Sequence, residues 1–359
     1  MRNFLMVKAF PENGNQNKSA KKPLSSHKSD LMHVVIVYEA VIPVKTYGGT
    51  GRDIWYLGNE LHKRGHKVTF LVAPGSECPF ADVLPLDKSR SLNAQIPASA
   101  DIVNIHYNPK EEIEKPCLAA IHGNSNNPEE VFPKNSVFVS KNHASRFGSD
   151  AFVYNGMDWD NYPAPDFSLR RKGYHFLGKA AWKVKNLKAA MAIARRNKTT
   201  LEVLGGYRFN FKMGMRFTLD PRVHFHGMVG DKEKAHVMNR SEALLFPVLW
   251  HEPMGLAVIE SLYYGCPVFA TPYGALPELV GEEFGALSAS LDTLSRAAAS
   301  AGEYNARRCH EYARDTYNAS RMTDKYLMYF EKVLNGNPIN PEQPRLQYPQ
   351  KEKYLEFAW

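Results

Sequence analysis

The sequence has no long hydrophobic run. None of its apolar stretches approaches the roughly 18 residues that span a membrane, and its N-terminus lacks the apolar core of a signal peptide. These two absences predict a cytoplasmic protein.

Cysteine is also scarce and no CxxC pair occurs, which argues against a disulfide framework and a zinc site and predicts buried thiols. The four cysteines are Cys78, Cys117, Cys266 and Cys309.

Several catalytic motifs are incomplete or absent. Ile54 stands where a GxGxxG fingerprint needs its third glycine, and there is no Walker lysine. No serine lies in a GxSxG motif. Asp158 opens a DWD triplet, but this triplet sits in a turn without a flanking strand pattern to hold a metal. His224 and His226 alternate on one predicted strand without a third ligand. The sequence therefore predicts no metal site and no metal requirement.

Charge is distributed unevenly along the chain. The 359 residues carry a formal net charge of +8, and residues 166–336 hold 24 basic and 17 acidic side chains. A basic second half suits a phosphate-rich ligand and permits peripheral contact with the inner face of a membrane, although a solvated basic face is the commoner explanation. Nucleic acid is discounted as a partner, because no stacking platform, zinc finger or helix-turn-helix signature accompanies the charge.

Short apolar runs alternate with helical patterns in two series. The first series is HVVIVYEA, KVTFLVA, DIVNIHY, CLAAIHG, SVFVSK and AFVYNG. The second follows the proline-rich joint NYPAPDF and is YHFLGK, TLEVLGG, VHFHGMV, EALLFPV and CPVFATP. Such alternation predicts an α/β protein with two Rossmann-like domains, whose parallel sheets collect ligands at the carboxyl ends of their strands.

The domain boundaries follow from these series. Asn318 caps a last predicted helix that ends at Gly336, and the tail beyond it is more aromatic than a disordered segment should be. We therefore expect this tail to pack back on the first domain. The predicted parts are a disordered leader over 1–31, an N-terminal domain over 32–160, a C-terminal domain over 161–317, and a helix and tail over 318–359.

The stretch WHEPMGLAVIESLYYG predicts a helix with an anion site at its start. Pro253 suits a first turn and a glycine follows Tyr264, so the helix is expected over residues 254–264. The amides of Met254, Gly255 and Leu256 then lack intrahelical partners, and a glycine there lets a phosphate approach the backbone.

Two glutamates flank this helix start. Glu252 and Glu260 lie two turns apart, about 12 Å along the axis, which is too far for an acid and base acting on one bond. They suit two hydroxyl acceptors on either side of a phosphate. The alternative is a capping glutamate and a surface glutamate on an ordinary amphipathic helix.

Two further segments suggest phosphate contacts. Gly48 and Gly49 precede a predicted helix and can bring an amide to a phosphate, or form only a tight turn. Lys179 ends a predicted strand and Lys185 begins a helix six residues later. If the two ammonium groups converge, an anion such as a leaving diphosphate belongs between them. The alternative is a solvated lysine-rich loop.

These segments together resemble the retaining glycosyltransferases of family 4, which have the two-domain GT-B fold with sheets facing a central cleft. The resemblance covers residues 32–336. It rests on GG at Gly48, RGHKVTF, IHG at Ile121, YNGMD, GK…K at Gly178, HGMVGDKE, HEPMGLAVIE with its two glutamates, and TPYGALPELV.

The resemblance implies roles for individual residues. Glu252 would accept hydroxyls of the donor sugar, Glu260 would accept the ribose hydroxyls, and the amides of Met254, Gly255 and Leu256 would hold the diphosphate. Lys179 and Lys185 would neutralise the leaving phosphates, although the first position is more often arginine in the family. His122 would lie near the reaction centre, and Met228 and Val229 would meet the base through their backbone.

The implied reaction moves a hexose-type sugar from a nucleoside-diphosphate sugar, with UDP or GDP favoured, to a glycan or lipid-linked acceptor with retention and without a metal or other cofactor. A bacterial cell-envelope polysaccharide is the product class that the family suggests. Three alternatives remain: a GT-B-like nucleotide-sugar epimerase, a sugar phosphorylase, and a catalytically silent sugar-nucleotide-binding protein. The residues specify neither the sugar nor the base nor the acceptor.

Overall fold

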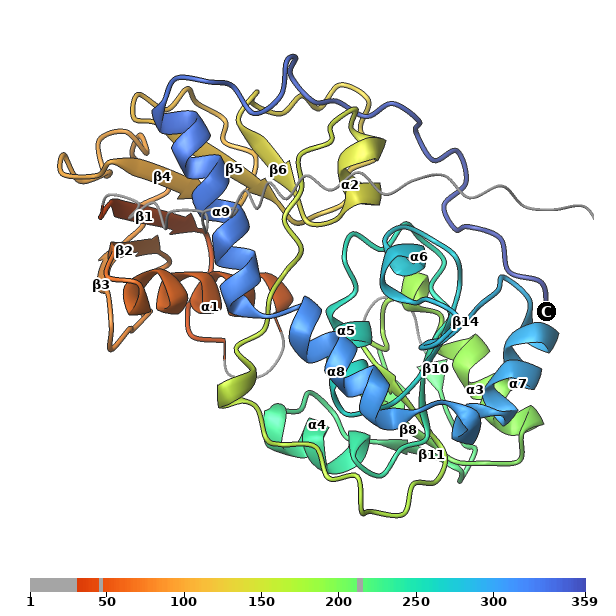
Figure 1. Cartoon of the computed structure of the whole chain (residues 1–359). Helices are drawn as coiled ribbons and strands as arrows, with labels where there is room; N and C mark the ends of the chain where they lie inside the picture. Colours follow the sequence, from red (N-terminus) through yellow and green to blue (C-terminus); the bar gives the residue numbers. More distant parts are fainter. Residues whose placement is uncertain (1–30, 45–47, 212–215) are drawn as a thin grey trace, which may run out of the picture. The chain divides into compact units, whose positions relative to one another are not determined.

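The computed structural model describes residues 31–44, 48–211 and 216–359. The expected leader at residues 1–31 therefore lies, apart from residue 31, outside the described residues. A first parallel sheet has the strand order β3-β2-β1-β4-β5-β6 (Figure 1). Its strands are β1 (His33–Tyr38), β2 (Lys67–Val72), β3 (Asp82–Pro85), β4 (Ile102–Ile105), β5 (Cys117–Ile121) and β6 (Ser136–Phe138), and its helices are α1 (Gly49–Lys63) and α2 (Lys141–Arg146).

A second parallel sheet has the order β11-β8-β7-β12-β13-β14. Its strands are β7 (Tyr174–Leu177), β8 (Leu201–Leu204), β11 (Val223–Phe225), β12 (Ala243–Phe246), β13 (Val268–Ala270) and β14 (Gly285–Leu287). Its helices are α3 (Leu187–Arg196), α4 (Asp231–Met238), α5 (Leu256–Tyr263), α6 (Leu276–Leu279), α7 (Leu291–Ala299) and α8 (Ala306–Thr316). A separate antiparallel pair, β9 (Phe209–Asn210) and β10 (Arg216–Phe217), follows β8.

The predicted α/β class with two parallel sheets is confirmed. Both sheets have near-continuous buried apolar strands, such as Val34, Val35 and Ile36, as expected for sheets covered on both faces. Two details differ from the sequence prediction. AFVYNG forms only an isolated bridge between Phe138 and Phe152. The edge strands β3 and β14 escaped prediction because they are short and only partly apolar.

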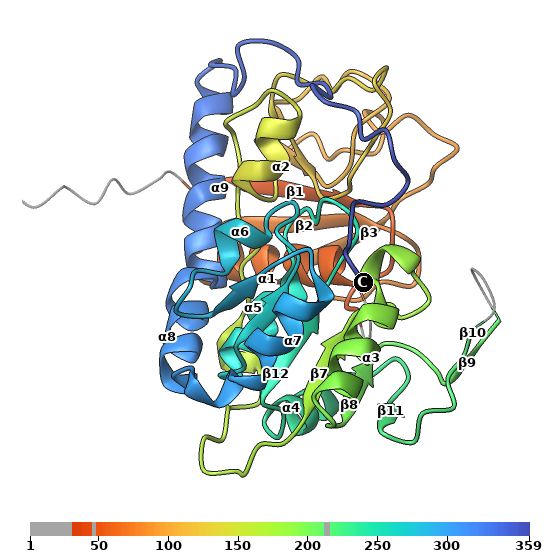
Figure 2. The same ribbon diagram turned by 90° about the vertical axis from the view of Figure 1, so that its right-hand side faces the viewer.

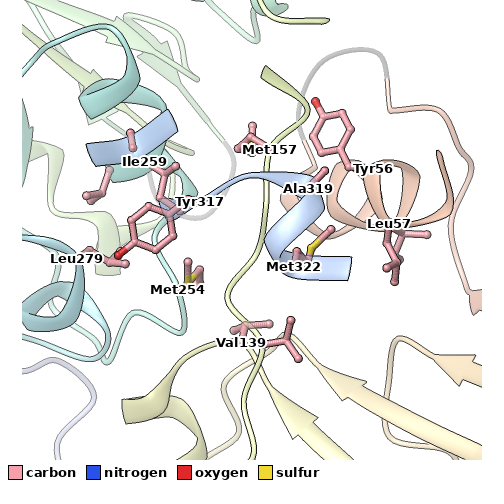
Figure 3. Packing of buried hydrophobic residues seen from close by; sticks show 14 of the residues in the cluster. Tyr56, Leu57, Val139, Met157, Met254, Ile259, Leu279, Tyr317, Ala319 and Met322 are labelled. Carbon is pink, nitrogen blue, oxygen red and sulfur yellow. The ribbon is translucent and has the colours of Figure 1, made fainter. Parts of the chain in front are cut away.

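The chain passes between the two sheets at adjacent points. Met157 and Asn318 form a parallel bridge, and the Met157 amide donates to the Tyr317 carbonyl at 3.0 Å. Helix α9 (Ala319–Leu334) then runs along α1 of the first half (Figure 1). Side chains from both halves share one apolar cluster here, with Met322 and Leu57 on one side and Ile259 and Leu279 on the other (Figure 3).

The C-terminal tail contacts both halves, whereas the sequence predicted contact with the first alone. Leu346 is buried in the first half among Phe132 and Phe147. Further along, the Leu355 amide donates to Leu249 and the Ala358 amide donates to Ala289, both in the second half. The tail therefore bridges the two halves. Within the described residues, no helix has the length and apolar character needed to cross a bilayer.

Candidate active site

A cavity of about 330 Å³ collects most of the residues that the sequence singled out. It opens among the strand ends and helix starts of both halves, as expected for ligand sites of parallel sheets. Eleven of the twelve predicted site residues line it: Gly48, Gly49, His122, Lys185, Met228, Val229, Glu252, Met254, Gly255, Leu256 and Glu260. Trp182, Trp250, Arg52 and Lys234 complete much of its wall.

Helix α5 points its N-terminus at this cavity. The helix begins at Leu256, two residues later than predicted, because Gly255 has a left-handed backbone with φ +95° and serves as the cap. The first intrahelical bond runs from the Val258 amide to the Gly255 carbonyl, so the amides of Leu256 and Ala257 precede it. Leu256 and Ala257 line the cavity, which makes the helix start a candidate anion site.

Glu252 is held by two donors from the second half. The Lys185 ammonium lies 2.6 Å from its Oε2 atom, and the Trp250 indole N–H lies 2.7 Å from the same oxygen. Both charged side chains are less than a tenth exposed. A buried pair of this kind is costly to break, because removal of one partner leaves the other charge without compensation. The pair therefore fixes both groups at the cavity wall.

Glu260 belongs to a larger buried network that joins the two halves. Lys234 on α4 donates to its Oε2 atom at 2.5 Å and also contacts Asp231 at 3.0 Å. Arg52 on α1 grips Asp231 with two contacts of 2.5 Å and lies 3.9 Å from Oε1 of Glu260. Although burial opposes ionisation, Lys234 and Arg52 keep the pKa of Asp231 below its ordinary value.

The first half contributes a neutral pair of histidines. His122 follows β5, and its Nε2 atom lies 2.9 Å from Nδ1 of His106. The second nitrogen of His106 lies 3.0 Å from the Asn104 side-chain oxygen. Burial lowers the pKa of His122 to about 4, so the ring is neutral at physiological pH. It can pass or accept a proton but does not add positive charge to the cavity.

The glycine pair brings the first half into contact with helix α5. Gly49 opens α1, and a Cβ atom at this position would lie 2.7 Å from the Leu256 side chain. Other polar contacts between the halves surround this point. Glu278 on α6 accepts from the backbone amides of Lys141 and Asn142 at the start of α2, and Ser140 donates to the Pro253 carbonyl at 2.6 Å.

Comparison with known proteins agrees with this geometry. Residues 167–301 match the family model described as "Glycosyl transferases group 1". An uncharacterized protein of 41.2 kDa from the cps region of Klebsiella pneumoniae is 24% identical over 116 residues. That alignment spans 30% of this chain and 32% of the relative, about a third of its length.

Two solved glycosyltransferase structures cover nearly the whole fold. AviGT4, a glycosyltransferase involved in avilamycin A biosynthesis, superposes with a TM-score of 0.70 at 20% identity, over 85% of this chain and 98% of that one. HepE from Anabaena, solved with UDP and glucose, gives a TM-score of 0.63 at 14% identity, over 84% and 99% of the two chains. The fold is that of the GT-B glycosyltransferases.

Residues 167–301 resemble the glycosyltransferase group 1 family, and the chain as a whole shares the fold of solved glycosyltransferases. The matched segment lies in the second half and contains Lys185, Glu252 and Glu260, the residues that the resemblance connected with the donor. The first half is related to these glycosyltransferases through its fold, because the structural matches extend over it at low identity.

Lys179 does not reach the cavity of this glycosyltransferase fold. Its ammonium group lies over the Trp182 ring, 5.1 Å from the centroid, whereas the Lys185 ammonium lies beside Glu252. The two ammonium groups therefore have different partners in this structure, and their meeting on one bound anion remains a prediction. The cause is local: Trp182 stands between the two lysines in sequence and offers its face to the first of them.

The three residues that the sequence analysis considered and rejected as metal ligands have other partners in the structure. Asp158 accepts from Asn59 and Asn161 beside the crossing between the halves. His224 and His226 both contact the carboxylate of Glu202 at 2.7 Å. Among the residues that the structure describes, no three His, Cys, Asp or Glu side chains are grouped to hold a metal. Metal independence remains a prediction.

Sequence reasoning missed Arg52, Asp231, Lys234 and Trp250. Trp250 lay within the quoted motif, two residues before Glu252, so its proximity was available from the sequence. Asp231 and Lys234 share a helix face at i and i+3, which is a readable pairing signal. Arg52 gave no such signal, because its partners Tyr162, Asp231 and Glu260 lie 110 or more positions away.

Proposed function

We propose that the protein transfers a hexose-type sugar from a nucleoside-diphosphate sugar to a glycan or lipid-linked acceptor, with retention of anomeric configuration and without a metal. The observation that carries the proposal is the meeting of the α5 N-terminus, the Lys185–Glu252 pair and Glu260 on one cavity wall. Oriented amides and an ammonium group are suited to a departing diphosphate. Two carboxylates on either side of it are suited to sugar and ribose hydroxyls.

Glu252 and Glu260 each have one oxygen committed to protein donors. Lys185 and Trp250 both contact Oε2 of Glu252, and Lys234 contacts Oε2 of Glu260. We assign the Oε1 atom of Glu252 to a hydroxyl of the donor sugar and that of Glu260 to the ribose. The diphosphate then lies between them at the amides of Leu256 and Ala257.

The chemical step follows from these charges. As the bond from the anomeric carbon to the diphosphate breaks, negative charge grows on the phosphate oxygens and positive character grows on the sugar. The α5 amides and Lys185 stabilise the negative charge on the phosphate oxygens. The acceptor attacks the anomeric carbon from the face that the diphosphate leaves. A phosphate oxygen takes the acceptor proton. His122 is neutral and lines the same cavity, so it is suited to contact the sugar or acceptor.

Donor and acceptor classes are proposed from the relatives. HepE was solved with UDP and glucose, which favours a UDP-sugar donor, with a GDP-sugar as the alternative. The matched Klebsiella protein is encoded in a cps region, which favours a cell-envelope polysaccharide as the product and a cytoplasmic site of action.

The test combines a binding screen with product analysis. Thermal shifts with UDP-, GDP- and ADP-sugars should reveal one stabilising donor, because a ligand that binds only the native state raises the midpoint. With that donor and an acceptor, release of nucleoside diphosphate should accompany a product whose anomeric NMR coupling matches that of the donor. An inverted product would overturn retention. A free epimerised sugar would favour an epimerase, and binding without turnover would favour a silent protein.

A further inference from the structure

The β9–β10 hairpin exposes apolar side chains on one face. Phe209 pairs with Phe217 across the two strands, with ring centroids 5.8 Å apart, and Phe211 contacts Phe217 at the same distance. Phe209 is 49% exposed, Phe217 is 54% exposed and Phe211 is 70% exposed. Leu219, two residues after Phe217 and therefore on the same face of the strand, is 79% exposed. Soluble surfaces rarely group so many exposed apolar side chains, and such patches mark interaction sites.

The polar face of the same hairpin is turned toward the protein. Thr218 is buried, and the Arg208 guanidinium donates to the carbonyl oxygens of Thr218, Asp220 and Val223 at 2.8, 3.2 and 2.6 Å. Alternation along the ribbon therefore places polar residues inside and apolar residues outside, the reverse of a strand on a soluble core. These inward contacts hold the apolar face outward.

The hairpin projects beside β11 at the edge of the second sheet (Figure 2). It leaves the sheet directly after Gly205, which lines the cavity, and Gly206 pairs with Gly227 at its base. Five of the twelve exposed large hydrophobic side chains among the described residues lie between positions 207 and 219. The apolar patch is thus concentrated in one short segment next to the candidate active site.

The charge around this patch is positive. At the hairpin base, Arg195 and Arg222 share the single carboxylate of Asp220. A symmetric contact between two copies would bring these like charges together, because a twofold interface pairs each patch with itself. An anionic lipid surface instead attracts the arginines while it accepts the phenyl rings.

We propose that the β9–β10 hairpin anchors the protein in the interface of bilayers that contain anionic lipid. Phe209, Phe211, Phe217 and Leu219 enter the region between headgroups and acyl chains, and the arginines at the hairpin base contact lipid phosphates. This inference goes beyond the proposed reaction, because membrane binding requires neither donor nor turnover. The two proposals therefore fail independently.

The experiment measures co-sedimentation of the full chain with two kinds of vesicle. One contains equal amounts of phosphatidylglycerol and phosphatidylcholine, and the other contains phosphatidylcholine alone. The wild-type chain should bind the anionic vesicles more strongly. The double variant Phe211→Ser/Leu219→Ser should reduce the partition coefficient about tenfold or more, because two apolar side chains no longer enter the bilayer. It leaves the Phe209–Phe217 pair in place.

Tyr348→Ser is the matched control, because Tyr348 is also exposed but lies in the C-terminal tail. It should bind vesicles as the wild type does, and all variants should retain the wild-type melting temperature. In addition, Phe211→Trp should show a blue shift of its fluorescence on addition of anionic vesicles. Equal binding of the double variant and wild type would overturn the proposal, as would absence of binding by the wild type. A dimer in solution that the double variant abolishes would also overturn it, in favour of a second copy.

Discussion

The two parallel sheets have the same topology but different chemistry at their strand ends. In both halves the strands follow the order 3-2-1-4-5-6 when each series is numbered along the chain. The first half presents the glycine pair and His122, which is paired with the buried His106, to the cavity. The second half presents the α5 N-terminus with the buried pairs Lys185–Glu252 and Lys234–Glu260.

This difference shows that a repeated fold does not repeat a site. Strand order and helix positions create a ligand-binding edge in each half, but the side chains at that edge decide what is bound. The second half supplies the α5 amides and Lys185, which suit the anionic donor. The first half adds Arg52 beside Glu260 and the neutral His122, which suits the acceptor and the reacting carbon.

The largest effect is expected for Lys185→Ala. Loss of this ammonium group removes stabilisation of the departing diphosphate and should raise the barrier by roughly 2–4 kcal/mol, comparable to a lost oxyanion donor. Turnover should fall with a smaller change in the KM of the donor. Steady-state kinetics with the donor found by thermal shift measures both quantities.

Lys179→Ala is the matched control for that variant. Its ammonium group lies over Trp182 outside the cavity lining, so we expect turnover to change several times less than in Lys185→Ala. Equal losses in the two variants would mean that Lys179 reaches the diphosphate when the donor is bound, and the convergence expected from the sequence would be restored.

Deletion of residues 340–359 should lower the stability of the whole chain. The deletion exposes the pocket that Leu346 fills in the first half and should cost about 2 kcal/mol for that side chain alone. Thermal or urea unfolding measures the loss. Deletion of residues 351–359 alone is the control, because it removes the second-half contacts of Leu355 and Ala358 but keeps Leu346. An unchanged midpoint after the longer deletion would contradict the prediction.

Arg52→Met tests whether the first half supports the ribose site of the second. The substitution leaves the Asp231 carboxylate without its two-pronged partner and removes a positive charge near Glu260. We expect the KM of the donor to rise about tenfold with a smaller change in turnover, the pattern of lost uniform binding.

Arg64→Met is the control for Arg52→Met. Arg64 lies at the C-terminal end of α1, and it contacts Glu60 and Asp324, which do not line the cavity. Its loss should leave the donor KM unchanged. Arg52→Lys should restore only part of the effect, because an ammonium group does not reproduce the fork of a guanidinium on a carboxylate. A donor KM that is normal in Arg52→Met would separate this residue from the donor site.

The fold was readable from the sequence because its signals are local. Apolar runs such as HVVIVY, the Asn318 cap and the glycine after Tyr264 each act within a few residues. The edge strands β3 and β14 were missed, unlike the edge strands β6 and β11, because their sequences DVLP and GAL are short and carry little apolar pattern. The start of α5 was placed two residues early, because Pro253 was assigned to the first turn while Gly255 adopts a left-handed cap.

Spacing alone connects only site residues that follow one another in the chain, whereas Gly48, His122 and Met228 were assigned to the site through the family resemblance. Glu252, Gly255 and Glu260 share one motif, so their proximity was available from spacing. The Arg52–Asp231 contact joins positions 179 residues apart and depends on the docking of the two halves. Lys179 lies over the Trp182 ring, and spacing along the chain carries no information about that contact.

The last comparison concerns acid stability, for which the two halves should behave alike. His143 on α2 and His175 on β7 are both fully buried, and burial lowers the pKa of each to about 3. The native chain keeps both rings neutral, whereas the unfolded chain binds a proton on each below about pH 6.5. Their contribution is therefore complete above that pH and is lost as the pH falls toward about 3.

As the pH falls through that window, each histidine should lower the free energy of unfolding by about 1.4 kcal/mol per pH unit. His143→Gln and His175→Gln should each reduce the slope of the unfolding free energy against pH, between about pH 6 and pH 4, by the amount that one proton contributes. This should hold even if both variants are less stable at neutral pH. Urea unfolding across this range measures the slope. If only one variant flattens it, the other ring is protonated in the native state, and the two halves differ in their interiors as well as at their strand ends.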